Sequence, residues 1–374
     1  MSTTSSPRSQ GGTVVTPTAT SRSLGSLTVE RHSQVDSLAP AWDELADRMS
    51  AMPWIRPGWI AAWRRAFGHG ALHILVARRG DRLCGVLPLQ RRFAELRSPT
   101  NPQTPAFCLL AEDTTTRQAL ATALLQQRPR GIDLRYLPLG EAGLEESAAA
   151  AKAAGYHVIH RTITRSPFVP TEGGWTVYER QVGAKKLREL RRRRRLLERQ
   201  GELCLDVQDG GRQLESLLEE GFRVEASGWK GQGATAINSS PAMRAFYKDV
   251  ARWAAARGWL RLAFLRLNGR ALAVDYGLEV GGVHFLLKTG YDPGYRRYGP
   301  GMLLRYEMLR RAFHSDLSTY ELLGTDSAWK SDWTNAVRPT MLLHAFAPSA
   351  LGLADRAAWG YGRPVAGRIL RRLR

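Results

Sequence analysis

The segment with the clearest chemical meaning runs Arg296-Arg297-Tyr298-Gly299-Pro300-Gly301. It follows an apolar, strand-like run at 283–289 and precedes an amphipathic, helix-like run at 302–313. Glycine has no Cβ, so its backbone can approach a ligand closely, and the first N–H groups of a helix lack intrahelical acceptors. Together with the positive end of the helix dipole, these features are typical of a site for a diphosphate.

The spacing of Arg296, Gly299 and Gly301 resembles the Arg/Gln-x-x-Gly-x-Gly/Ala loop of the GNAT acyltransferase superfamily. In that superfamily the loop holds the pyrophosphate of acyl-coenzyme A. The resemblance therefore implies that acyl-CoA is a co-substrate and that the loop, with Arg297 and Tyr298, belongs to its binding site.

Further motifs follow one another in the order found in a narrower group. They are 225–231 (Glu-Ala-Ser-Gly-Trp-Lys-Gly), 287–293 (Leu-Lys-Thr-Gly-Tyr-Asp-Pro), 323–326 (Leu-Gly-Thr-Asp) and 329–334 (Trp-Lys-Ser-Asp-Trp-Thr). From about residue 42 to residue 346 the chain resembles the CelD-type, or BioF2-like, acetyltransferases, which are similar in turn to the Fem aminoacyltransferases. The resemblance implies an α/β (α+β) fold of two tandem GNAT units, with two mixed sheets flanked by helices.

Acyl transfer from a thioester to an amine requires an oriented carbonyl, a neutral amine and a proton for the leaving thiolate. The resemblance places Lys288, Thr289 and Tyr291 beside the donor. Either Tyr291 or Tyr298 is a candidate source of that proton. Asp326, at the end of the next strand, is a candidate general base or amine-orienting group; capping the following helix is its alternative role. Lys330 aligns with a lysine near the reacting centre of Fem-like enzymes, where it would stabilise developing negative charge.

The acceptor site is expected to include Glu225, Trp229, Lys230 and Trp333, which stand in loop-like or aromatic motifs. The implied function is an acyl-CoA-dependent N-acyltransferase acting on an amine of a cell-envelope precursor. An amino sugar of an exopolysaccharide and a sphingoid-type lipid amine, as in GNAT-like bacterial ceramide synthases, are both open as acceptors. Two alternatives stand beside this function: a Fem-type aminoacyl-tRNA-dependent transferase and a non-enzymatic binder of anions or nucleic acid.

Two similar successions of elements must position these residues. The first has a strand at 27–31, helical patterning at 41–67 broken near Pro53 and Pro57, a hairpin at 72–78 and 83–89, helices at 115–127 and 145–154, and strands at 132–137 and 156–169. The second has a strand at 203–207, helices at 213–228 and 241–257, a hairpin at 260–267 and 271–279, the strand and helix around the glycine loop, a strand at 319–323, a short helix near 327–334 and a strand at 341–346. This repeated order predicts a tandem pair of domains.

The chain is accordingly divided into five parts. They are a disordered tail at 1–26, an N-terminal GNAT-like domain at 27–174, a basic linker helix at 175–200, a C-terminal GNAT domain with the acyl-CoA site at 201–347, and a basic amphipathic tail at 348–374. The first half has no glycine loop between its fourth strand and the next helix. We expect it to be a degenerate copy that shapes the acceptor pocket.

The balance of charge favours anionic partners. The chain has 54 Lys and Arg against 34 Asp and Glu, a formal net charge of +20. Two segments are candidates for contact with an anionic membrane surface: the arginines at 191–195 and the C-terminal segment at 362–374. The alternative for the first is a solvated helix face, and the alternative for the second is a helix packed on the domain. Nucleic acid is not the expected partner.

The three cysteines are far apart and odd in number, so neither a disulfide framework nor a metal site is expected. No apolar run reaches the roughly 18 residues of a membrane-spanning helix. We therefore expect a cytoplasmic protein, attached to a membrane only from its inner surface if at all.

Overall fold

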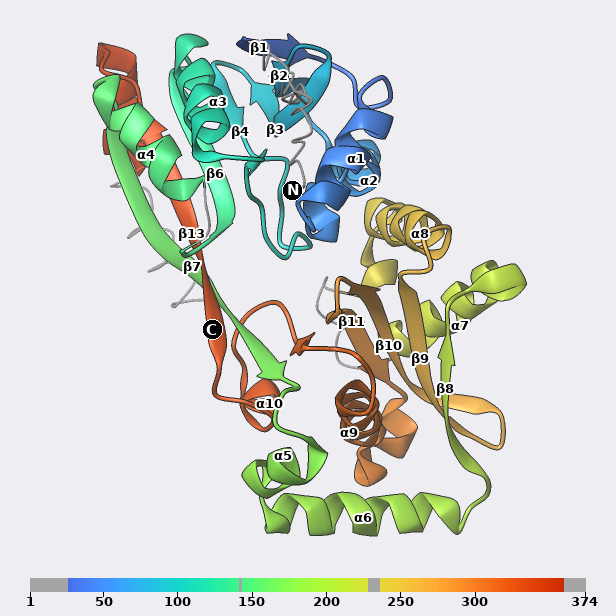
Figure 1. Ribbon diagram of the computed structural model, residues 1–374. Helices are drawn as coiled ribbons and strands as arrows, with labels where there is room; N and C mark the ends of the chain where they lie inside the picture. The colour runs from blue at the N-terminus through green and yellow to red at the C-terminus, as the bar shows by residue number, and fades with distance from the viewer. Residues whose placement is uncertain (1–25, 141–142, 228–235, 360–374) are drawn as a thin grey trace, which may run out of the picture.

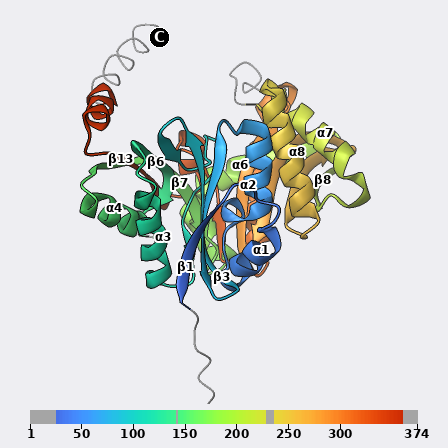
Figure 2. The same cartoon turned by 90° about the horizontal axis from the view of Figure 1, so that it is seen from above.

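The computed structural model describes residues 26–140, 143–227 and 236–359. Within these ranges, 13 strands form one continuous mixed sheet (Figures 1 and 2). Along its main path the strands follow the order β1-β2-β3-β4-β6-β13-β7-β12-β11-β10-β9-β8, and β5 pairs with β3. The tandem α/β architecture expected from the sequence is confirmed, but its two sheets are joined edge to edge.

The first half of the chain builds one end of this sheet. Its elements are β1 (Leu27–His32), α1 (Ala39–Arg48), the short 3₁₀ helix η1 (Pro53–Ile55), α2 (Pro57–Phe67), β2 (Ala71–Arg79), β3 (Arg82–Arg92), β4 (Glu95–Arg97), β5 (Leu110–Ala111), α3 (Thr114–Gln126), β6 (Gly131–Pro138), α4 (Leu144–Ala153) and β7 (His157–Pro170). The expected break in the first helical region lies at Pro53 and Pro57, because proline starts a helix readily but interrupts a running one.

Two helices, α5 (Trp175–Val182) and α6 (Ala184–Glu198), connect the halves. The second half then contains β8 (Leu203–Gln208), η2 (Gly211–Gln213), α7 (Leu214–Ala226), η4 (Ile237–Ser239), α8 (Pro241–Ala255), β9 (Leu260–Leu267), β10 (Arg270–Val280), β11 (Val283–Tyr291), η5 (Pro293–Tyr298), α9 (Pro300–Phe313), β12 (Thr319–Glu321), α10 (Ala328–Ser331) and β13 (Val337–Phe346). The β9–β10 hairpin turns at Asn268 and Gly269, whose φ angles of 48° and 80° both lie in the left-handed region that a type I′ turn requires.

The two halves exchange strands in the centre of the sheet. The last strand of the chain, β13, pairs with β6 and β7 of the first half. The end of β7 in turn pairs with β12 of the second half, from Phe168 opposite Glu321 to Pro170 opposite Thr319. The sheet of the first half is therefore completed by residues that the sequence-based division assigned to the second domain.

Packing also joins the halves. The ring of Trp59 on α2 meets Phe246 on α8 edge-on, with ring centroids 5.2 Å apart, and Phe67 contacts the same phenylalanine. One buried apolar cluster accordingly extends through both halves. No helix in the described ranges is both long and apolar enough to cross a bilayer.

Candidate functional site

A cleft opens where β11 and β12 diverge. These parallel strands pair only from Val283 opposite Thr319 to Phe285 opposite Glu321, and β11 then continues to Tyr291 while β12 ends. Next to this point β11 has one extra residue, since Tyr276 pairs with Lys288 but Gly277 pairs with Leu286. Such a bulge bends a strand and redirects its side chains, and bulges are frequent beside active sites.

Two cavities lie at this divergence and share Thr289 and Trp329 in their walls. The first, which we call the loop cavity, has a volume of about 340 Å³ and contains the glycine loop. Its lining consists of Arg193, Glu225, Thr289, Gly290, Tyr291, Arg296, Gly299, Pro300, Gly301, Met302, Arg305 and Trp329. The shared residues make the two cavities neighbours at the end of β11.

The glycine loop takes its shape from its own backbone. Gly299 adopts φ 60° and ψ 50°, a left-handed conformation that glycine adopts easily, and its carbonyl accepts the N–H groups of Met302 and Leu303 at 3.0 and 3.1 Å. Pro300 follows as the first residue of α9, where its missing N–H costs nothing. A Cβ at Gly301 would reach only ordinary contact with Tyr291, at 3.4 Å. Among the backbone N–H groups of residues 299–303, that of Gly301 is therefore the one left for a ligand in the loop cavity.

Two arginines flank this backbone from different elements. Arg296 comes from the loop itself, and Arg193 comes from α6, where its Nε donates to Glu189 at 2.6 Å. A Cβ at Gly299 would lie 2.4 Å from Nη1 of Arg193, so the guanidinium packs directly on the glycine. The N–H of Gly301, the positive end of the α9 dipole and two guanidinium groups together suit a diphosphate.

Carboxylates neutralise much of the basic run on α6. Glu189 accepts from Arg192 and Arg193, and these hydrogen bonds hold the pKa of the glutamate well below its ordinary value. Arg194 pairs with Glu198 and Glu307. Of the five arginines at 191–195, only Arg193 lines the loop cavity. The sequence of this basic run does not indicate which of the five would do so.

A buried ion pair stands at the floor of the loop cavity. Arg305 donates from Nη2 to Oδ1 of Asp275 at 2.7 Å and from Nη1 to the hydroxyl of Tyr320, and Arg305 and Asp275 are each about 1% exposed. The strand β10 alternates here, since Val274 and Tyr276 face α7 whereas Asp275 faces α9. The pair thus fixes α9, and with it the glycine loop, on the sheet.

The second cavity, which we call the interhalf cavity, has a volume of about 400 Å³ and draws on both halves of the chain. Its lining consists of Pro102, Gln103, Thr104, Pro105, Tyr136, Thr164, Tyr247, Leu286, Leu287, Lys288, Thr289, Leu322, Leu323, Gly324, Thr325, Trp329 and Lys330. The hydroxyl of Tyr247 donates to Oε1 of Gln103 at 3.0 Å across the boundary between the halves. Tyr136 has a φ of 62°, which is rare for an aromatic residue, and strained backbone of this kind is often found at functional sites.

Lys330 is buried at the edge of the interhalf cavity. Its ammonium donates to the carbonyls of Leu323 and Thr325, the latter at 2.9 Å. Leu323 and Gly324 both have positive φ, so the lysine holds a tight turn after β12. The sequence placed this residue near the reacting centre, and the structure gives it a position beside the cavity together with a clear role in loop geometry.

Asp326, in contrast, lies outside both cavities. Its side chain is exposed and accepts a hydrogen bond from the hydroxyl of Ser331 at 3.3 Å. The turn held by Lys330 directs the chain outward at this point. Asp326 is also not the cap of α10, because that position belongs to Ser327.

Three other residues expected in the site also lie outside both cavities. Arg297 is exposed and donates to the hydroxyl of Tyr298, which is itself buried in the core under the loop. Trp333 is buried, and its carbonyl accepts from the hydroxyl of Tyr178 at 2.9 Å. None of the three lines either cavity. Trp229 and Lys230 lie outside the described residues.

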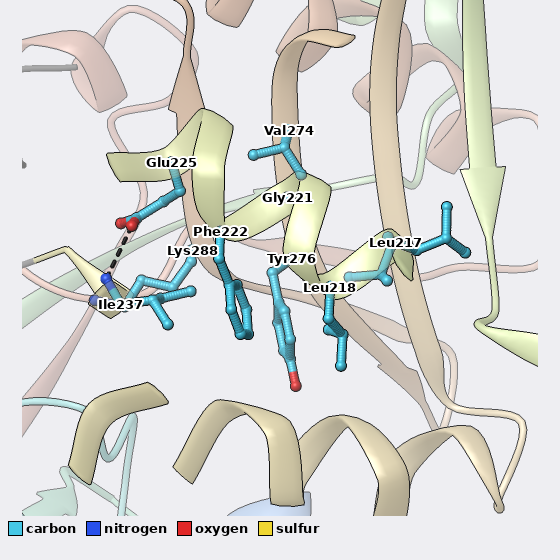
Figure 3. A pocket seen from close by; sticks show the side chains of 10 residues that line it. Leu217, Leu218, Gly221, Phe222, Glu225, Ile237, Val274, Tyr276 and Lys288 are labelled. Atoms are coloured by element: carbon cyan, nitrogen blue, oxygen red, sulfur yellow. Dashed lines mark hydrogen bonds between the residues drawn. The ribbon is translucent and has the colours of Figure 1, made fainter. Parts of the chain in front are cut away.

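Glu225 is the only carboxylate that lines the loop cavity or the interhalf cavity in the part of the chain that the structure describes. Its carboxylate accepts the N–H of Ile237 at 2.9 Å (Figure 3). A Cβ at Gly290 would lie 2.4 Å from the Cα of Glu225, so this glycine allows the end of α7 to rest on β11. Behind Glu225, the space between α7 and the sheet is about 10 Å³, enough for one water at most, and α7 is therefore closely packed.

The first half has no equivalent of the glycine loop, in agreement with the sequence. At the start of α3, Asp113 accepts the N–H of Thr116 at 2.8 Å and pairs with Arg79 at 2.7 Å. The hydrogen bond from Thr116 lowers the pKa of this carboxyl, which therefore stays ionised. A negative charge occupies the position where a phosphate would have to bind.

Comparison with known proteins agrees with this arrangement. Residues 184–331 match the family model described as Acetyltransferase (GNAT) domain. The matched range contains the glycine loop, both strands that diverge and Glu225. The protein therefore carries a GNAT acetyltransferase domain and is an acyltransferase.

Solved structures extend the comparison to most of the chain. The C-terminal domain (DUF2156) of a putative lysylphosphatidylglycerol synthetase from Agrobacterium fabrum has a TM-score of 0.55 at 12% identity, covering 87% of this chain and 96% of that chain. The crystal structure of FemX has a TM-score of 0.55 at 12% identity, and the match covers 84% of this chain and 96% of FemX. A tandem GNAT protein from the clavulanic acid biosynthesis pathway has a TM-score of 0.46 at 15% identity, and the match covers 87% of this chain and 100% of that protein. The comparison with curated proteins found no match. The first two similarities show the fold: it extends through both halves.

Proposed function

We propose that the protein is an acyl-CoA-dependent N-acyltransferase of the CelD-type or BioF2-like group, and that it acylates an amine of a cell-envelope precursor. The observation that carries the proposal is the pair of cavities that meet at Thr289 and Trp329, where β11 and β12 diverge. The loop cavity suits the donor, because Arg193, Arg296 and the start of α9 can receive its diphosphate. The interhalf cavity is left for the acceptor.

In the proposed reaction the amine attacks the thioester carbonyl carbon, so that a C–N bond forms and the C–S bond breaks. The amine loses a proton, and the leaving thiolate of coenzyme A gains one. We assign the amine proton to Glu225, which replaces Asp326 because the latter is exposed outside the cavities. Tyr291 lines the loop cavity and is the candidate donor to the thiolate, while Lys330 adds positive charge beside the acceptor.

The lining of the interhalf cavity bears on the acceptor. Gln103, Tyr136 and Thr164 contribute amide and hydroxyl groups from the first half. Such groups support an acceptor that carries hydroxyls near its amine, as both an amino sugar and a sphingoid-type amine do. The degenerate half would then select the acceptor while the second half holds the donor.

An aminoacyl-tRNA-dependent transferase is the second candidate. It is supported by an open groove of about 830 Å³ that adjoins the loop cavity through Arg193 and Met302 and is also lined by Lys185 and Lys186. Glu189 and Asp332 also line this groove and pair with Arg193 and Lys186, so its size and Lys185 are what support a larger anionic donor. The two candidates differ in the donor, and a donor-binding experiment separates them.

The test uses purified protein, acyl-CoAs of increasing chain length, and glucosamine or sphinganine as acceptor. We expect free thiol to be released and an N-acyl product to be identified by mass spectrometry. Arg296→Ala should weaken acyl-CoA binding roughly tenfold or more, since a charge-assisted hydrogen bond contributes about 1.5–3 kcal/mol. The matched control is Arg297→Ala, because this neighbour is exposed outside the cavity. Absence of acyl-CoA binding, with transfer from aminoacyl-tRNA, would establish the second candidate instead.

A further inference from the structure

Phe93 occupies a position that the fold does not explain. It lies in the turn between β3 and β4, its side chain is 86% exposed, and its φ is 53°. Glycine and asparagine are common in this left-handed region, whereas a bulky side chain there is strained. No core contact offsets the strain, because the ring faces solvent. An outlier of this kind points to a role outside the folded chain.

The surroundings of Phe93 are basic and partly apolar. Its neighbours Arg91 and Ala94 line an open groove of about 660 Å³, together with Arg128, Arg130 and Leu351. Leu351 is 64% exposed and belongs to the helix at residues 350–359. No acidic residue lines this groove within the described part of the chain. We call Arg91, Arg92, Phe93, Arg128 and Leu351 the hairpin patch.

Positive charge in the hairpin patch is not neutralised by carboxylates of the ranges that the structure covers. Among the described residues, the guanidinium groups of Arg91, Arg92 and Arg128 have no carboxylate partner. Arg130, by comparison, pairs with Asp355 at 2.7 Å. The arginines at 192–194 on α6 are likewise paired with glutamates. Positive charge without a carboxylate partner in the described part of the chain therefore lies beside an aromatic ring that is 86% exposed.

We propose that the hairpin patch binds the surface of an anionic phospholipid bilayer. The ring of Phe93 enters the interface between headgroups and acyl chains, Leu351 adds apolar area, and the unpaired arginines contact lipid phosphates. Surface association requires both apolar insertion and basic charge, and the patch supplies both. This contact is separate from the acyl-transfer site and does not depend on the proposed function.

The test is co-sedimentation of the full chain with vesicles, either of phosphatidylcholine alone or of phosphatidylcholine mixed with phosphatidylglycerol. We expect binding to the mixed vesicles only, weakened by salt. Phe93→Gly should weaken it roughly tenfold and leave the melting temperature unchanged or higher, because glycine accepts this φ. Arg128→Ala should weaken binding about fivefold. A merely structural role for Phe93 would instead lower the melting temperature.

Two control variants separate the patch from general hydrophobicity and charge. Val177→Ser removes a 47% exposed apolar side chain on α5, and Arg195→Ala removes an exposed arginine on α6, both at the opposite end of the molecule (Figure 1). Both variants should bind the mixed vesicles as the original chain does. The proposal is overturned if the original chain does not bind these vesicles, if Phe93→Gly binds as well as it does, or if the controls reduce binding equally.

Discussion

A single methyl group should have different effects at the two glycines of the loop, Gly301 and Gly299. At Gly301 there is room for it. Its Cβ would stand 3.4 and 3.8 Å from atoms of Tyr291, which are ordinary van der Waals distances. Gly301 is also the second residue of α9, where alanine is a better helix former by up to about 1 kcal/mol. The folded protein should therefore accept Gly301→Ala with an unchanged or slightly higher melting temperature.

Donor binding should also survive this substitution. The loop pattern that Gly301 matches accepts glycine or alanine at this position, so the methyl group should leave room for the diphosphate. Binding of coenzyme A should therefore change by less than about threefold, which corresponds to roughly 0.7 kcal/mol. Isothermal titration calorimetry with coenzyme A measures this change, and thermal unfolding of the same samples measures stability.

Gly299→Ala provides the contrasting variant. Its φ of 60° makes a side chain unfavourable by about 1–2 kcal/mol, and its Cβ would lie 2.4 Å from Nη1 of Arg193. This variant should lose both stability and affinity. If Gly299→Ala binds coenzyme A as tightly as the original chain, the loop does not hold the diphosphate. If Gly301→Ala melts several degrees lower, the packing against Tyr291 is not as described.

Three further outcomes follow from the site and its supports. Glu225→Gln should lower kcat for acyl transfer by at least about a hundredfold, whereas Asp326→Asn should leave it near the original value, both measured by thiol release. Arg305→Met should destabilise the protein by about 3–5 kcal/mol because it leaves the Asp275 carboxylate buried without its partner, and adding Asp275→Asn should restore most of that loss in a urea double-mutant cycle. Burial lowers the pKa of His73 to about 4, so the unfolded chain takes up a proton first on acidification. Stability should therefore fall as pH drops from 6.5 to 4, and His73→Leu should flatten that slope in unfolding titrations.

Local signals made most of the elements predictable. Asn268-Gly269 marks its hairpin because only left-handed residues match the twist of the strands, and Pro53 and Pro57 mark a break because proline cannot continue a helix. The glycine loop was found for the same reason, because its shape depends on residues that are neighbours in the chain. Arg296, Gly299 and Gly301 accordingly line one cavity.

The sequence predicted the direction of individual side chains less well than it predicted the elements. Asp326 was expected in the cleft because it follows a strand, but the turn at Leu323 and Gly324 directs it to solvent. Arg193 belongs to a run of five arginines. It lies in the loop cavity because α6 packs so that this guanidinium rests on Gly299. Tyr136 gave no signal at all, since its strained φ arises where β6 and β13 pair irregularly.

The sequence by itself determined the order of the elements, the position of the glycine loop and the lack of such a loop in the first half, because each depends on residues close together in the chain. Only the tertiary structure decided that β13 enters the first sheet between β6 and β7. It also brought Glu225, Arg305 and Trp329 to one cavity. An apolar strand pattern specifies which side chains are buried but not which strand lies beside it. The interhalf cavity, which residues of both halves line, is therefore a property of the folded chain.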